Sequence, residues 1–203
     1  SRKEAEELGN KISSGFTQSK IASPIPLVKE VKGQDIRISH PAKQAHLYYG
    51  APIIKRGDPD FLTLYLGNYI LGGGGFVSRL TQVIREDRGL AYSVYSYFMP
   101  FIEKGPFQIG VQTKKNQVDQ AKKLIEKTVA EFIKDGPTSD ELKRAKDFMI
   151  GGFPLKLDSN KSILEYVSMM AFYKYPLDYL DTFTKKIDKI SAEEIKSAFQ
   201  RRV

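Results

Sequence analysis

The chain has 203 residues, of which 41% are hydrophobic and 28% are charged, which is enough apolar material for a buried core and excludes a disordered or fibrous protein. Its net charge of +8 is divided evenly between the two halves of the sequence, so it excludes a basic tail or arm and gives little support to nucleic acid as a partner. The absence of cysteine excludes disulfide bonds, thiolate metal sites and a cysteine nucleophile, and no apolar run is long enough for a transmembrane segment.

The N-terminal part is expected to follow another domain. Residues 4–13 have the pattern of a short helix, and residues 16–30 contain the Ser, Thr, Gln and Pro that are typical of a linker. The sequence does not begin with Met, and it stops inside a predicted helix. We therefore expect residues 1–30 to be the helix and linker from a preceding domain, and residues 31–203 to be one domain of that longer chain.

Two strands and a helix are predicted next. The strand-like runs lie at residues 35–39 and 45–51. Asp58 would then cap a helix that has Pro59 in its first position, because an aspartate followed by a proline is a common helix start. The glycine run at residues 72–75 would have to end this helix, since glycine is a poor helix former.

The second half of the chain predicts a hairpin followed by helices. A second helix would stop at Gly89, and the aromatic and β-branched residues at 91–102 and 107–112 predict an antiparallel hairpin. Further helices are predicted at 118–133, 140–152, 160–173 and 178–188 and after the capping box that begins at Ser191. Strands and helices do not alternate regularly, so the expected class is α+β, an antiparallel sheet with helices packed on one face.

The run Gly72, Gly73, Gly74 and Gly75 is the most distinctive local feature. It is not a phosphate-binding P-loop, because no Lys-Ser or Lys-Thr follows it and a helix rather than a strand precedes it. A hinge or a close approach of the backbone between two helices is the more ordinary interpretation, since glycine has no side chain and adds mobility.

Other chemical motifs are weak. The two histidines, His40 and His46, belong to neither His-Glu-x-x-His nor His-x-x-Glu-His, so we expect a surface His40, a half-buried His46 and no metal site. Gly-x-Ser-x-Gly does not occur. The aromatic cluster at residues 92–107 could stack on nucleic-acid bases, but such alternation is more typical of residues within a sheet.

One longer segment resembles a known family. It has a glycine-rich loop followed by Ser78-Arg79-Leu80, and then the run Arg-x-x-x-Gly-Leu-x-Tyr that starts at Arg85. The later segments at residues 136–142 and 190–195 are also similar. The segment resembles the non-catalytic, C-terminal-type domain of pitrilysin-family zinc metallopeptidases, which include insulin-degrading enzyme and mitochondrial processing peptidase, and the likeness covers roughly residues 20–203.

The resemblance implies a role in peptide binding. In this family, one half of a closed chamber carries His-x-x-Glu-His and zinc, and the other half contributes an arginine and a tyrosine, seven residues apart, that bind the substrate. Arg85 and Tyr92 match this pair, whereas Arg88 is only four residues from Tyr92. A guanidinium can hold a peptide carbonyl or carboxylate through paired donors, and a phenol can donate to the oxygen that becomes negative. Without the resemblance, Arg85 would be interpreted as a helix-closing cation and Tyr92 as a packed strand residue.

The segment that corresponds to the family's zinc helix, residues 64–69, contains neither histidine nor glutamate. We therefore predict no zinc in this domain and no peptidase activity from this chain alone. The chain would be the substrate-binding half of a zinc metallopeptidase, and zinc would lie in a His-x-x-Glu-His partner in the same chain or in a separate subunit. The alternative is a structural or assembly subunit without a protease role. Paired bacterial relatives are commonly exported, so the expected location is the periplasm or cell envelope.

Overall fold

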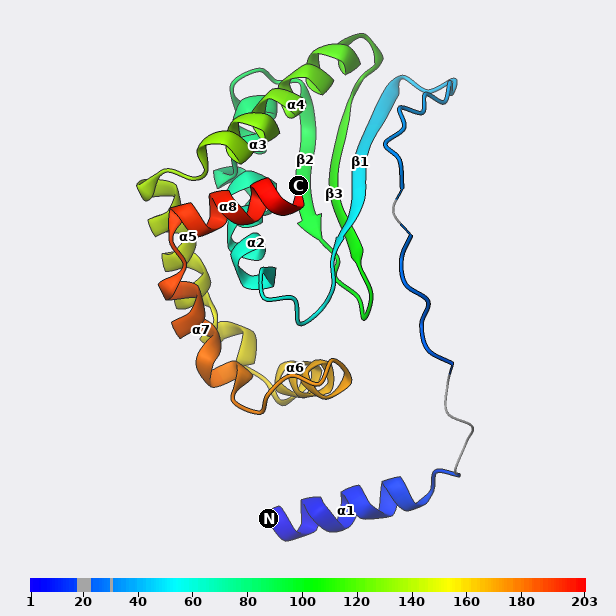
Figure 1. Cartoon of the computed structure of the whole chain (residues 1–203), viewed down its shortest axis with the longest axis vertical. Helices are drawn as coiled ribbons and strands as arrows, with labels where there is room; N and C mark the ends of the chain where they lie inside the picture. Colours follow the sequence, from blue (N-terminus) through cyan, green and yellow to red (C-terminus); the bar gives the residue numbers. More distant parts are fainter. Residues whose placement is uncertain (18–22, 30) are drawn as a thin grey trace.

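The computed structural model describes residues 1–17, 23–29 and 31–203, and its centre is a three-stranded antiparallel sheet (Figure 1). The strands are β1 (Gln44–Ile54), β2 (Ala91–Phe98) and β3 (Gly105–Lys114), and β3 lies between the other two. β2 and β3 form the hairpin that the sequence predicts. The helices that pack on the sheet lie on one of its faces, which confirms the α+β prediction.

Helices make up most of the remaining chain. The predicted N-terminal helix is confirmed as α1 (Arg2–Ser14), which buries none of its side chains and lies apart from the sheet (Figure 1). The capping boxes at Thr138 and Ser191 both form, so α5 (Ser139–Gly152) and α8 (Ala192–Arg202) begin at the predicted places. The other α-helices are α2 (Phe61–Asn68), α3 (Arg79–Thr81), α4 (Val118–Asp135), α6 (Asn160–Phe172) and α7 (Tyr179–Lys189).

The strand predicted at residues 35–39 is wrong. This segment has no regular structure, and its two isoleucines, Ile36 and Ile38, are exposed. A period-two pattern yields a strand only where a neighbouring strand completes the hydrogen bonds, and β1 pairs with β3 instead. The segment is tied to the domain by an ion pair between Asp35 and Lys122 of α4, with an N–O distance of 2.6 Å.

The predicted start of α2 is two residues too early. The helix begins at Phe61, and the Asp58 carboxylate accepts a hydrogen bond of 2.9 Å from the backbone N–H of Asp60 rather than capping a helix. Both aspartates are held by the C-terminal helix, because Arg201 donates to Asp60 and Arg202 donates to Asp58 and Asp60 at 2.9–3.1 Å. These long-range ion pairs fix the loop that precedes α2.

The glycine run ends the helix, as the sequence predicts. Helical backbone continues from α2 through a π-helical segment, Tyr69–Gly73, and stops at Gly74. A second π-helical segment, Gln82–Glu86, follows α3 and leads to Gly89, whose positive φ of 59° reverses the chain before β2. This second segment carries Arg85.

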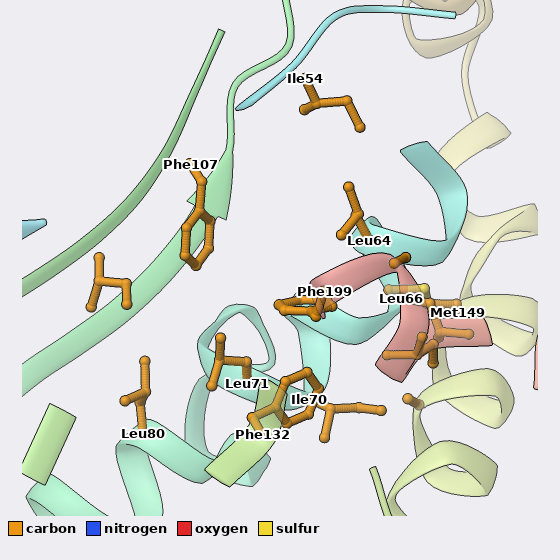
Figure 2. Close-up of a cluster of buried hydrophobic side chains, with 14 of the residues drawn as sticks. Ile54, Leu64, Leu66, Ile70, Leu71, Leu80, Phe107, Phe132, Met149 and Phe199 are labelled. Atoms are coloured by element: carbon orange, nitrogen blue, oxygen red, sulfur yellow. The ribbon is translucent and has the colours of Figure 1, made fainter. Parts of the chain in front are cut away.

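The core lies between the sheet and the helices (Figure 2). Phe132 of α4 and Phe199 of α8 are fully buried and meet edge to face, with ring centroids 4.8 Å apart. Phe199 also rests on Gly67 of α2, where an added Cβ would lie 2.5 Å from the Phe199 ring. The last helix is therefore an integral part of the core.

Hydrogen bonds from Arg79 connect the start of α3 to the turn between α4 and α5 and to the first turn of α5. Its guanidinium makes paired hydrogen bonds of 2.6 and 2.7 Å to Glu141, donates to the carbonyl of Gly136 and lies 5.0 Å from the Phe132 ring. Burial alone would raise the pKa of the Glu141 carboxyl. The hydrogen bonds from Arg79 and Thr138 outweigh burial and hold that pKa below its usual value. This anchor fixes the helix that leads to Arg85.

Candidate functional site

Arg85 and Tyr92, which the sequence pairs only by spacing, lie side by side in the structure. The guanidinium carbon of Arg85 is 5.2 Å from the centre of the Tyr92 ring and 4.6 Å from the centre of the Phe76 ring. Each residue comes from a different segment: Phe76 from the short 3₁₀ turn Gly75–Val77, Arg85 from the second π-helical segment, and Tyr92 from the start of β2. Three adjacent segments thus build one cluster, which we call the Arg85 cluster.

The Arg85 cluster faces solvent. Tyr92 is 83% exposed and Phe76 is 66% exposed, whereas the Arg85 side chain between them is 31% exposed. Nε of Arg85 lies 3.4 Å from a carboxylate oxygen of Glu86, and the Tyr92 hydroxyl has no hydrogen-bond partner among the described residues. A guanidinium held between two rings keeps its in-plane donors at the edges, where a ligand can reach them.

Phe76 is not among the residues that the sequence motif predicts for the site. The available signal was its position, since a large aromatic residue directly after a glycine run and followed by valine is unusual for a surface turn. Arg88, the alternative arginine, has a different role. Its guanidinium donates a 3.1 Å hydrogen bond to the carbonyl of Val83 and so closes the end of the preceding helix.

The glycines of the run lie where the backbone passes very close to its neighbours. A Cβ at Gly72 would lie 2.4 Å from Oγ of Ser96 and 2.8 Å from Leu80, and one at Gly73 would lie 2.6 Å from Asn68. A Cβ on Gly74 would lie 2.6 Å from the carbonyl oxygen of Tyr69, and Gly75 has a φ of +60° that favours glycine.

Asn68 of α2 and Ser96 of β2 form a hydrogen-bonded pair beside the glycine run. Oγ of Ser96 donates to the Asn68 side chain at 2.7 Å, and Nδ2 of Asn68 donates back to the Ser96 carbonyl at 3.1 Å. Both side chains are buried, so the pair joins the glycine run to β2 without leaving these atoms unpaired. Movement of the run as a hinge remains a prediction.

Replacing Gly72 with alanine is expected to destabilise the domain by about 1–3 kcal/mol, because the new methyl group would overlap Ser96 and Leu80. Gly151→Ala is the matched control. Gly151 lies in α5 with nothing within 4 Å of an added Cβ, so alanine should stabilise the helix by about 0.5–1 kcal/mol. Urea unfolding of both variants measures the difference, and equal stability of the two variants would contradict the close approach.

The described residues do not contain a cluster that could hold a metal. No group of three or more His, Cys, Asp or Glu side chains comes together in this part of the chain. Residues 64–69, which are expected to correspond to the family's zinc helix, lie in and just after α2, where Leu64 and Leu66 are fully buried. The donor set here therefore does not fit zinc.

The prediction of a half-buried His46 is wrong. His46 is exposed because it lies on the face of the edge strand β1 that none of the described helices covers (Figure 1), and it stacks on Tyr48 with ring centroids 6.2 Å apart. His40 is exposed, as expected.

Among the described helices, none combines the length and apolar character that crossing a bilayer requires.

A family model described as the peptidase M16 inactive domain matches residues 1–149. The chain therefore belongs to the inactive-domain family of M16 peptidases, which confirms the resemblance to pitrilysin-type proteins. It is an inactive domain of the kind found in proteins of the zinc-protease family.

Curated relatives and solved structures agree with this assignment. The non-peptidase homolog YmxG of Helicobacter pylori is 37% identical over 155 residues, 75% of this chain and 35% of that protein. The uncharacterized zinc protease YmxG of Bacillus subtilis is 41% identical over 120 residues, 59% of this chain and 29% of that protein. The chain thus spans about a third of the length of these relatives.

Among solved structures, the peptidase M16 inactive domain from Pseudomonas fluorescens superposes with a TM-score of 0.94 at 36% identity, covering 100% of this chain and 48% of that one. The periplasmic protease PqqL of Escherichia coli has a TM-score of 0.79 at 13% identity and covers 100% of this chain and 23% of that one, so it shares the fold alone.

Proposed function

We propose that the chain is the substrate-binding, non-catalytic half of a zinc metallopeptidase that cleaves peptides or small unfolded proteins. The observation that carries the proposal is the Arg85 cluster, in which a guanidinium and a phenol hydroxyl lie together on the surface with unused donors. Membership in the M16 inactive-domain family supports the same interpretation.

In this proposal the two polar side chains bind different parts of the peptide backbone. Arg85 holds a carbonyl or carboxylate oxygen through its paired N–H donors, and Phe76 keeps the guanidinium plane in place. The Tyr92 hydroxyl donates a hydrogen bond to the oxygen of the bond that is cleaved, where negative charge develops. The exposed ring of Phe76 offers an apolar contact for a substrate side chain.

Zinc and the base that activates water would belong to a His-x-x-Glu-His partner half, since the residues described here do not fit the metal. The partner would be a domain of the same chain or a separate subunit. The lengths of the curated relatives, of which this chain spans about a third, leave room for a preceding domain.

Reconstitution tests the proposal. The chain is mixed with a purified His-x-x-Glu-His half of the same protein or operon, and cleavage of a fluorogenic peptide is followed. We expect little cleavage by either half alone and a large increase for the mixture, because only the mixture has both the metal and the Arg85 cluster. A catalytic half that is fully active without this chain would contradict the proposal.

A structural or assembly role is the second candidate. It is supported by the name of the Helicobacter pylori relative, which is described as a non-peptidase homolog. This role would be favoured if the chain co-purified with a large membrane complex and did not stimulate any His-x-x-Glu-His half.

A further inference from the structure

A cavity of about 370 Å³ opens at the opposite end of the sheet from the Arg85 cluster. It lies between the end of β1, the start of α2 and helices α6 and α7, and its walls include Arg56, Phe61, Tyr65, Tyr166 and Tyr179. β1 ends opposite Gly105 of β3, whereas β2 begins opposite Thr113. The two sites are therefore separated by roughly 25 Å along β3.

Arg56 is the unusual residue of this cavity. Its guanidinium carbon is 5.3 Å from the centre of the Phe61 ring and 5.2 Å from that of Tyr173, so it is held between two rings. Its Nε is buried without a hydrogen-bond partner, and the side chain forms no ion pair with any described residue. A buried donor that is left unpaired destabilises the protein, and a ligand that accepts its hydrogen bond would remove this cost.

The nearest carboxylates along the chain do not satisfy Arg56. Asp58 and Asp60 are only two and four residues away, but both are engaged by Arg201 and Arg202 of α8. The backbone of Arg56 is also fixed, because its N–H donates to the carbonyl of Phe101 at 2.7 Å. The rings of Phe61 and Tyr173 hold the guanidinium in the cavity wall, where no carboxylate of the described residues forms an ion pair with it.

Phenol hydroxyls add further donors to the cavity. Tyr65, Tyr166 and Tyr179 line it, and none of their hydroxyls bonds to a described residue. Burial, with smaller contributions from neighbouring tyrosines, raises the pKa of Tyr179 to about 12, so this hydroxyl keeps its proton at neutral pH and can donate it. The rest of the wall is largely apolar and includes Met169 and Phe183.

We propose that this cavity binds a carboxylate carried on an apolar group. The Arg56 guanidinium and the tyrosine hydroxyls would bind the carboxylate, and the aromatic wall would enclose the apolar part. A free aromatic or aliphatic acid and the C-terminal residue of a peptide share this chemistry. The site is independent of the proposed peptidase role, because it uses none of the residues of the Arg85 cluster.

Two charged side chains at the cavity, Lys156 and Glu165, are exposed. Their charges oppose one another and leave the net positive charge of Arg56. Glu165 is the natural competitor of a ligand carboxylate, since a change of rotamer could bring it toward the guanidinium. Glu165→Gln should therefore strengthen binding of an anion, whereas Lys156→Gln should weaken it only slightly because an exposed ammonium is screened by solvent.

Calorimetry with a matched pair of ligands tests the proposal on the unmodified chain. N-acetylphenylalanine carries the carboxylate, and N-acetylphenylalaninamide has the same shape without the charge. We expect the acid to bind about tenfold or more tightly than the amide, as a charge-assisted hydrogen bond to Arg56 requires. Equal affinity, or no binding of the acid, would overturn the proposal.

Arginine variants locate the bound acid. Arg56→Gln should abolish the difference between acid and amide, whereas Arg88→Gln, which removes an arginine outside both sites, should leave it unchanged. Loss of binding in Arg85→Gln alone would place the acid at the Arg85 cluster and overturn the proposal. Met169→Trp, which fills the cavity without removing a charge, should also abolish binding and guards against a misfolded Arg56 variant.

A third comparison identifies the source of the carboxylate. A hexapeptide that ends in phenylalanine with a free carboxylate is compared with its C-terminal amide. Preference for the free peptide, lost in Arg56→Gln, supports a peptide C-terminus, and binding of N-acetylphenylalanine alone supports a small free acid. Binding that appears only in Glu165→Gln would mean that Glu165 already neutralises Arg56, and the proposal would fail.

Discussion

Tyr92→Phe is expected to lower the turnover of the reconstituted peptidase by about 100-fold, with little change in KM, because it removes one donor to the oxygen that becomes negative in the transition state. The substitution removes only the hydroxyl of a side chain that is 83% exposed, so the free energy of unfolding should stay within about 0.5 kcal/mol. Steady-state kinetics on the mixture of the two halves, with urea unfolding in parallel, measures both quantities.

Arg85→Gln is expected to raise KM more than it lowers turnover, because the guanidinium would hold the substrate before and during the reaction. Arg88→Gln is the matched control, since it removes an arginine three residues away whose partners among the described residues are the Val83 carbonyl and the neighbouring Asp87. Unchanged kinetics for both Tyr92→Phe and Arg85→Gln would refute the assigned roles while leaving the family assignment intact.

Phe199→Ala is expected to destabilise the domain by about 3–5 kcal/mol, because it empties a fully buried site that Phe132, Phe98 and Gly67 surround. For a chain of this length the midpoint of thermal unfolding should fall by about 10 °C or more. The effect matters because Phe199 lies beyond residues 1–149, so it tests whether the C-terminal helix belongs to the same cooperative unit.

Phe16→Ala provides the control for Phe199→Ala. Phe16 follows α1 and is 77% exposed, so its removal should change the free energy of unfolding by less than about 0.5 kcal/mol. A small effect of Phe199→Ala, comparable to that of Phe16→Ala, would mean that α8 folds and unfolds independently of the sheet.

The parts of the fold that local sequence determines were predictable. Capping boxes and the heptad-like apolar stripe place α4, α5 and α8 within a few residues, and β-branched and aromatic alternation finds the hairpin of β2 and β3. The predictions are wrong where residues that are distant in the sequence determine the local structure. Residues 35–39 lack a partner strand, and the start of α2 is set by Arg201 and Arg202, about 140 positions later.

The candidate sites also contain some residues that a local sequence motif identifies and others that only the fold brings together. Arg85 and Tyr92 were found because their spacing of seven residues is part of a recognisable sequence run, but Phe76, the third member of the cluster, required knowledge of how the glycine run folds back. The cavity at Arg56 could not be predicted, because its wall combines a loop near residue 56 with helices that begin a hundred residues later.

Because the segment Gln82–Glu86 is π-helical, the geometry of the Arg85 cluster depends on how many residues this segment contains as well as on which residues they are. It is closed by the N–H of Asp87, which donates to the carbonyl of Gln82 five positions earlier at 2.9 Å. One residue more per turn rotates everything after it by about 100° around the helix axis. Deleting Val83 would keep the seven-residue spacing from arginine to tyrosine and every side chain of the cluster, yet turn the guanidinium away from Phe76. A relative can therefore match the motif letter for letter and still lack the site, if its helix is one residue shorter.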